Sequence, residues 1–156
     1  MAHRPYVAVI GPSDATSLQI RDAEAIGRGL ADGGAILVCG GLGGVMDAAC
    51  HGASATAGTT VGILPGTDRD SANEWVQISL PTGLGELRNG LVIGAADAVI
   101  AVGGAYGTLS EIALALRAGV PVIGLNTWEI EGIELVQSAT EAVSRALQRS
   151  AGRGDS

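Results

Sequence analysis

The sequence predicts an α/β fold: a Rossmann-like open parallel sheet with helices on both faces, in a single domain. Short apolar runs without polar alternation, typical of strands buried on both faces, alternate with segments of helical spacing. Two of these runs end in glycine-rich turns that lead directly into helices, as in βαβ units. The length of 156 residues fits one domain, and no stretch has the composition of a linker.

The clearest unit is AVIAVGGAYGTLSEIALALRAGVPVIGL, residues 98–125. Residues 98–102 are rich in β-branched side chains and predict a buried strand. The glycines that follow permit a sharp turn and a close approach to a ligand. Residues 108–111 (TLSE) match the capping-box pattern, so a helix is expected to begin at Thr108, with residues 109, 112, 113 and 116 facing the sheet. Gly119 is expected to end that helix before a strand at 121–125.

The other expected strands and helices also alternate along the chain. The TSLQ stretch at 16–19 resembles a second capping box and predicts a helix to about residue 32. Further strands are expected at 6–11, 35–39, 60–64 and 75–80, and further helices at about 45–57, 83–96 and 135–149. The connection 65–74 is short for a crossover helix. The domain is expected to span residues 1–149, with a disordered tail at 150–156.

The composition limits the partners and the chemistry. Only 16% of residues are charged, against about 25% in an ordinary soluble domain, so part of the surface is expected to be buried in a homodimer or higher homo-oligomer. The net charge of −7 makes nucleic acid an unfavourable partner. All nine basic residues are arginine, which excludes a Walker-A lysine and a pyridoxal-phosphate enzyme.

The two cysteines, Cys39 and Cys50, show neither metal-ligand spacing nor a disulfide framework. We expect buried thiols, no bound metal and a cytoplasmic protein. No signal peptide is visible, and no apolar run is long enough to span a membrane, so no membrane partner is expected.

Two glycine turns are expected at the same edge of the sheet, at residues 40–44 and 103–107. Each would direct backbone N–H groups and a helix dipole at a ligand, which favours an anion and most naturally a phosphate. Neither turn matches the dinucleotide pattern G-x-G-x-x-G. The alternative is that these glycines only permit tight packing.

Arg88 and Glu111 are the two candidates for chemistry, and each has a structural alternative. Arg88 lies at the edge of an expected apolar stripe of Leu84, Leu87 and Leu91, where it must either reach water or meet an anion. Glu111 is either the capping-box glutamate or a carboxylate that faces the ligand.

Four motifs in order resemble the Lonely Guy (LOG) superfamily, long labelled "lysine decarboxylase-like". They are GGLGGVMD at 40–47, VGILP at 61–65, RN at 88–89 and GGAYGTLSE at 103–111. The resemblance implies the Rossmann-like fold, a phosphate site and a homo-oligomer. Characterised LOG enzymes cleave the N-glycosidic bond of cytokinin nucleoside 5′-monophosphates, with an arginine and a glutamate that correspond here to Arg88 and Glu111.

Three departures from the LOG signature PGGxGTxxE and its Arg-Lys pair place the chain nearer the branch of molybdenum cofactor carrier-like bacterial proteins. Val102 replaces the proline, the glycine turn is one residue longer, and Asn89 replaces the lysine. The resemblance does not imply lysine decarboxylation, since the chain lacks the lysine that pyridoxal phosphate needs.

Two functions follow from this reading, and the sequence leaves both open. One is hydrolysis of an AMP-like nucleoside 5′-monophosphate to free base and ribose 5-phosphate, with Arg88 and Glu111 catalytic. The other is a non-catalytic carrier or sensor of molybdenum cofactor or a nucleotide. In either case the small phosphorylated ligand is the partner, and no separate cofactor is expected. The expected ligand-binding residues are Gly11, Ser13, Gly40, Gly41, Gly43, Gly44, Met46, Gly103, Gly104, Tyr106, Gly107 and Thr108.

Overall fold

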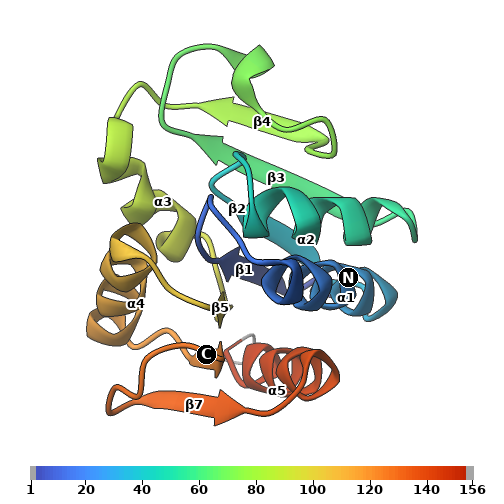
Figure 1. The fold of residues 1–156 in the computed structure, drawn as a ribbon, viewed down its shortest axis with the longest axis vertical. Helices are drawn as coiled ribbons and strands as arrows, with labels where there is room; N and C mark the ends of the chain where they lie inside the picture. Colours follow the sequence, from blue (N-terminus) through green and yellow to red (C-terminus); the bar gives the residue numbers. More distant parts are fainter. Residues whose placement is uncertain (1–2, 154–156) are drawn as a thin grey trace.

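The computed structural model describes residues 3–153, which form one seven-stranded sheet with helices on both faces (Figure 1). The α/β prediction is therefore confirmed. The strands are β1 (Tyr6–Ile10), β2 (Ile36–Cys39), β3 (Thr59–Leu64), β4 (Ile78–Pro81), β5 (Ala98–Val102), β6 (Val122–Leu125) and β7 (Ile133–Val136). The α-helices are α1 (Ser17–Asp32), α2 (Val45–Ser54), α3 (Asn89–Gly94), α4 (Tyr106–Ala118) and α5 (Ala139–Ala151), with short 3₁₀ helices η1 (Arg69–Ser71) and η2 (Gly85–Arg88).

All neighbouring strands are parallel, in the order β4-β3-β2-β1-β5-β6-β7. The chain moves outward from β1 through β2 and β3 to β4, and then returns to the other side of β1 with β5. The order therefore reverses between β1 and β5. Ligands bind at such a switch point, beyond the carboxyl ends of the strands.

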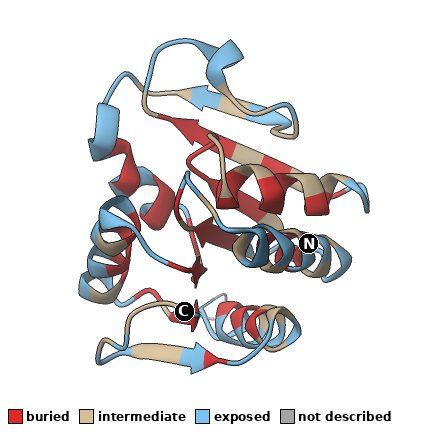
Figure 2. Cartoon of the chain, viewed as in Figure 1, coloured by how far each residue is buried: buried red, intermediate tan, exposed pale blue. Residues whose placement is uncertain are grey.

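Two apolar cores lie on opposite faces of this sheet. Residues of α1, α2 and α5 pack on one face, and residues of α3 and α4 pack on the other. Strand β5 is buried along its whole length, as its unbroken apolar run predicts. Figure 2 shows this burial in the central strands and exposure along the outer strand β4.

The prediction of a helix at 135–149 is wrong at both ends. Strand β7 was not predicted: residues 133 and 134 were assigned to no element, and residues 135 and 136 were assigned to the following helix. Helix α5 instead begins after Ser138, whose side chain accepts a hydrogen bond from the Glu141 N–H at 3.1 Å. It continues to Ala151 and buries Ser150, so the tail predicted from 150 onward does not begin there. Residues 154–156 of that tail lie outside the described residues.

The short connection from β3 to β4 crosses the sheet without an α-helix. The connection consists instead of η1 and an extended segment that hydrogen-bonds to Thr60. The Thr60 hydroxyl donates to the Trp75 carbonyl at 2.7 Å and accepts from the Gln77 N–H at 2.9 Å. Trp75 stacks on His51 of α2 with ring centroids 4.2 Å apart. Strand β4 therefore begins at Ile78, later than the predicted residue 75.

The remaining predictions on the core agree with the structure. Thr16 and Gln19 form the expected capping box at the start of α1. Cys39 and Cys50 are buried free thiols with their Sγ atoms 3.5 Å apart. Within residues 3–153 no helix is long and apolar enough to cross a membrane.

Helices α1 and α2 approach each other through glycine. A Cβ atom added at Gly27 of α1 would overlap the Ala49 carbonyl oxygen of α2, and one added at Gly52 of α2 would overlap the Glu24 carbonyl oxygen of α1. The contact is therefore backbone against backbone, which no rotamer change can relieve.

We expect Gly27→Ala to lower the free energy of unfolding by about 3 kcal/mol or more, because the two helices must separate to admit the methyl group. Gly90→Ala is the matched control. It lies in α3 with nothing within 4 Å of an added Cβ, and helix propensity predicts a gain of up to about 1 kcal/mol. Urea unfolding of both variants measures the difference. Equal stabilities would contradict the close packing of α1 on α2.

Candidate functional site

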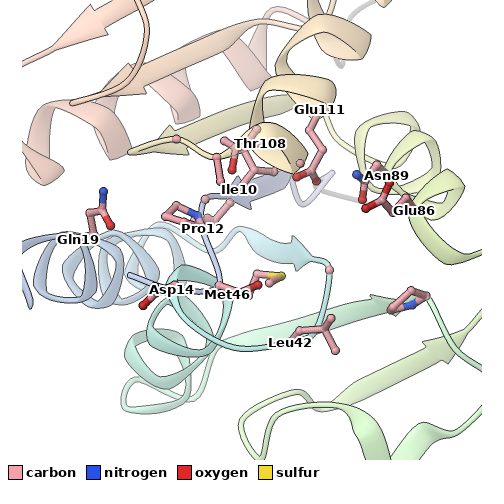
Figure 3. A pocket seen from close by; sticks show the side chains of 18 of the residues that line it. Ile10, Pro12, Asp14, Gln19, Leu42, Met46, Glu86, Asn89, Thr108 and Glu111 are labelled. Carbon is pink, nitrogen blue, oxygen red and sulfur yellow. The ribbon is translucent and has the colours of Figure 1, made fainter. Parts of the chain in front are cut away.

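A pocket of about 580 Å³ opens at the switch point, where the loops after β1, β2, β3 and β5 meet (Figure 3). Nine of the predicted site residues line it: Gly11, Ser13, Gly40, Met46, Arg88, Gly104, Gly107, Thr108 and Glu111. Segments far apart in the sequence thus converge on one cavity, as the topology requires.

Five predicted ligand-binding residues do not line the pocket. Gly41, Gly44 and Gly103 have positive φ, and an added Cβ would overlap Leu64, Pro12 and Gln19 respectively. These glycines let the loops pack together, which is the alternative that the sequence left open. Gly43 has open space around it, and Tyr106 is 90% exposed.

Helix α4 begins at Tyr106, two residues earlier than predicted, and no side chain caps it. Its first helical bond runs from the Leu109 N–H to the Ala105 carbonyl at 2.9 Å, so three preceding N–H groups lack an acceptor within the helix. The TLSE stretch is therefore not a capping box. The buried face also differs from the prediction, since Thr108, Glu111, Ile112 and Ala115 face inward while Ala113 is exposed.

Helix α2 also begins without a side-chain cap, after Gly44. By contrast, α1 and α5 are capped by Thr16 and Ser138. Helix α3, which continues directly from η2, also lacks a side-chain cap, but α2 and α4 are the uncapped helices that follow the two glycine turns. Met46 of α2 and Thr108 of α4 both line the pocket. The Val45 N–H of α2 already donates to the Pro12 carbonyl at 3.1 Å. The N–H groups of the next residues of α2 and of the first turn of α4, with the positive ends of two helix dipoles, therefore lie at the pocket wall.

The predicted helix 83–96 is broken, which changes the position of Arg88. Gly83 and Gly85 adopt positive φ, and η2 replaces the first helical turns. The leucines of the expected apolar stripe, Leu84, Leu87 and Leu91, are exposed, and Leu87 is 79% exposed. Arg88 and Asn89 face inward instead.

Arg88 is only 9% exposed, and main-chain carbonyls surround its guanidinium group. Its Nε donates to the Ile63 carbonyl at 2.9 Å and one Nη donates to the Gly40 carbonyl at 3.4 Å. Its other Nη donates to the Asn89 Oδ1. A Cβ at residue 40 would overlap this guanidinium group, so the glycine makes room for it. Arg88 thus ties the loop after β2 and the carboxyl end of β3 to α3. Among the described residues no carboxylate oxygen lies within 4 Å of it.

Glu111 projects from α4 into the pocket and is 8% exposed (Figure 3). Burial raises its pKa to about 7, and the charge of Arg88 opposes this shift. Within residues 3–153 no group donates a hydrogen bond to its carboxylate. A buried carboxyl that titrates near neutrality without an internal donor is typical of functional sites.

Several lining residues were not among the predicted site residues. Asp14, Gln19, Glu86 and Asn89 add polar groups, and Leu42 and Pro65 add apolar surface. Figure 3 shows Glu111, Asn89 and Glu86 on one side of the pocket and Asp14 and Gln19 on the other. A signal for Glu86 and Asn89 was present in the glycines at 83 and 85, which break the predicted helix. No group of three metal-ligating side chains is found in the part of the chain that the structure describes.

Residues 4–151 match the family model described as the SLOG cluster4 family. The chain belongs to this family. The match covers almost the whole chain and confirms the predicted membership of the LOG-like superfamily.

The SLOG cluster4 chain is similar to three proteins over nearly their whole lengths. An uncharacterized protein of Archaeoglobus fulgidus is 39% identical over 145 residues, which are 92% of this chain and 95% of that one. The molybdenum cofactor binding protein of Rippkaea orientalis has a TM-score of 0.88 and 33% identity, covering 95% and 98% of the two chains. The molybdenum cofactor carrier protein of Chlamydomonas reinhardtii has a TM-score of 0.88 and 32% identity, covering 96% and 99%. The expected placement near the carrier-like branch is confirmed.

The raised pKa of Glu111 predicts a pH-dependent stability. The folded protein holds this proton more tightly than the unfolded chain, so the proton stabilises the fold at low pH. That stabilisation is lost as the pH rises from about 4.5 to about 7. Glu111→Gln should therefore raise the melting temperature at pH 8 and change it little at pH 5, with a gain of roughly 2–3 kcal/mol at the higher pH.

The control for this prediction is Glu86→Gln, which removes a carboxylate from the exposed rim of the same pocket. Calorimetric melts of both variants at the two pH values make the comparison. Arg88 is the cation near Glu111, and Asp14 and Glu86 are the other carboxylates of the pocket, both exposed. A Glu111→Gln melt that is lower than the wild-type melt at pH 8 would show that the carboxylate stabilises the fold.

Proposed function

We propose that the pocket binds a small phosphorylated ligand of the molybdenum cofactor or nucleotide class, and that the protein carries this ligand without converting it. The observation that carries the proposal is the convergence of two uncapped helix N-termini, α2 and α4, on one pocket. Main-chain N–H groups at such ends bind phosphate well. The similarity to a molybdenum cofactor binding protein and a carrier protein supports the carrier role.

The phosphate lies at the ends of α2 and α4 in this proposal, and the rest of the ligand extends toward Glu111. The only cation that lines the pocket within the described residues is Arg88, whose hydrogen bonds go to the Gly40 and Ile63 carbonyls and to Asn89. These bonds use three of the five guanidinium N–H groups, so the donors available to the phosphate are the main-chain N–H groups and the two remaining N–H groups of Arg88.

Substitution at Ala105 tests the phosphate site. Ala105 is the N-cap residue of α4, lines the pocket and has an extended backbone. Ala105→Asp should cap the helix with its own carboxylate, stabilising the free protein by about 1 kcal/mol. The same carboxylate should occupy the N–H groups and weaken binding of AMP and inorganic phosphate roughly tenfold. Thermal melts with millimolar AMP or phosphate measure both effects, since a ligand that binds the folded state raises the melting temperature.

Ser138→Asp is the control, because it adds the same charge to the cap of α5, outside the pocket. It should leave the ligand-induced rise in melting temperature intact. A wild-type protein whose melt responds to neither AMP nor phosphate would contradict the phosphate site.

A second candidate function is hydrolysis of a nucleoside 5′-monophosphate, and Glu111 is the observation that favours it. A carboxyl with a pKa of about 7 is suited to acid–base catalysis or to stabilising an oxocarbenium-like transition state. Incubation with a panel of nucleoside monophosphates separates the two functions. Intact ligand supports the carrier, and release of free base and ribose 5-phosphate supports the enzyme.

We further propose that the protein is at least a dimer, with the exposed leucines of η2 and α3 at the contact. Leu84, Leu87 and Leu91 form an apolar surface on a chain that is only 16% charged. Leu87→Asp should shift the mass measured by light scattering toward the monomer value of 15.5 kDa. Leu18→Asp, on the exposed side of α1, is the control and should keep the wild-type mass. A wild-type mass near 15.5 kDa would overturn the proposal.

A further inference from the structure

At one end of the pocket, the mostly buried side chains of Glu111 and Asn89 present polar atoms that no protein group pairs with. The two side chains are 8% and 5% exposed, and both line the pocket. Within residues 3–153 the Glu111 carboxylate has no hydrogen-bond donor and the Asn89 Nδ2 has no acceptor. Among the described residues only Thr127 Oγ1 is both fully buried and unpaired, so the unpaired polar atoms of Glu111 and Asn89 open onto the pocket. They are therefore available to hydrogen-bond a ligand that enters it.

The hydrogen bond from Arg88 sets the direction of the Asn89 amide. Only the amide oxygen can accept this bond, and it does so from an Nη of Arg88. The Nδ2 group is therefore not used in this bond, and its N–H groups are available to donate to a ligand. The pocket end thus offers two carboxylate acceptors from Glu111 and an N–H donor from Asn89.

This pocket end is set back from the helix terminus that binds phosphate in the proposed function. Glu111 lies five residues after Tyr106, so its Cα is roughly 7–8 Å along the helix axis. A side chain in a helix leans toward the N-terminus, which directs the carboxylate back over the pocket. The group that meets Glu111 and Asn89 is therefore a different part of the ligand from the phosphate.

We propose that Glu111 and Asn89 bind the edge of a heterocycle that presents a carbonyl, a ring N–H and an amino group in a row. This inference rests on the proposed function for the position of the phosphate. The 2-amino-4-oxopyrimidine ring shared by guanine and pterins has this edge. Its ring N–H and amino group would donate to the two oxygens of Glu111, and its carbonyl would accept from the Asn89 Nδ2. Paired hydrogen bonds to a carboxylate are strong and geometrically selective.

Other nucleobase edges fit this arrangement less well. Hypoxanthine has the carbonyl and the ring N–H but lacks the amino group, which leaves one carboxylate oxygen unpaired. Adenine has an amino group where the carbonyl is required and a bare ring nitrogen where the N–H is required. A site built to accept an N–H strongly disfavours analogues that lack it, because its own polar group then stays unpaired.

Binding of GMP, IMP and AMP to the purified protein tests this proposal, since these ligands share the ribose phosphate and differ only at the edge in question. Isothermal titration calorimetry should rank the affinities GMP, then IMP, then AMP, with GMP bound roughly tenfold to a hundredfold more tightly than IMP. Glu111→Gln should reduce the preference for GMP over IMP to about twofold or less, since an amide has a single acceptor atom.

Glu86→Gln is the matched control, because it removes a carboxylate from the same side of the pocket but from its exposed rim. It should change the GMP and IMP affinities by the same factor and keep their ratio. Equal wild-type affinities for GMP and IMP, or a preference for AMP, would overturn the inference and leave the phosphate site standing. If the protein binds inorganic phosphate and none of the three nucleotides, the heterocycle site fails alone. If it binds none of the nucleotides and no phosphate, the proposed function fails with it.

Discussion

The burial of Arg88 is the constraint on which the shape of the site depends. A guanidinium group removed from water needs acceptors for its N–H groups, and here the carbonyls of Gly40 and Ile63 and the Asn89 amide accept three of the five. These groups belong to the loop after β2, to the carboxyl end of β3 and to the start of α3. One cation therefore fixes three segments relative to one another, and its charge opposes the rise in the pKa of Glu111.

The same site departs from the rules that the rest of the protein follows. Helices α1 and α5 begin with side-chain caps, whereas α2 and α4 begin with free N–H groups at the pocket. Glu111 is largely buried and receives no hydrogen bond from the protein, and this burial destabilises its ionised form. Each departure lowers the stability of the unliganded protein, and each becomes favourable when a ligand supplies the missing partner. Such local conflicts mark functional sites in an otherwise consistent sequence.

The sequence was sufficient for the central sheet and the location of the pocket, but not for the details of either. Apolar runs predicted β1, β2, β3 and β5 because strands covered on both faces carry mainly apolar side chains, whereas the exposed edge strand β4 was predicted to begin too early. Strand β7 was missed since four residues at a sheet edge carry little pattern. The predicted helix 83–96 failed because two glycines adopt positive φ, which depends on tertiary packing and exposes Leu87. Glu111 was assigned correctly to the pocket lining, but the capping alternative failed when α4 began at Tyr106.

The side-chain charges around the pocket do little to attract an anion, and the protein as a whole has a net charge of −7. Asp14, Glu86 and Glu111 line it, against the single cation Arg88, and no lysine exists to add another. Electrostatic attraction from side chains is therefore weak at this site. Recognition must come from short-range donors instead, namely the free main-chain N–H groups and the amide of Asn89. Hydrogen bonds of this kind depend on geometry and less on bulk charge, so the site selects a ligand by the arrangement of its donors and acceptors and not by its charge alone.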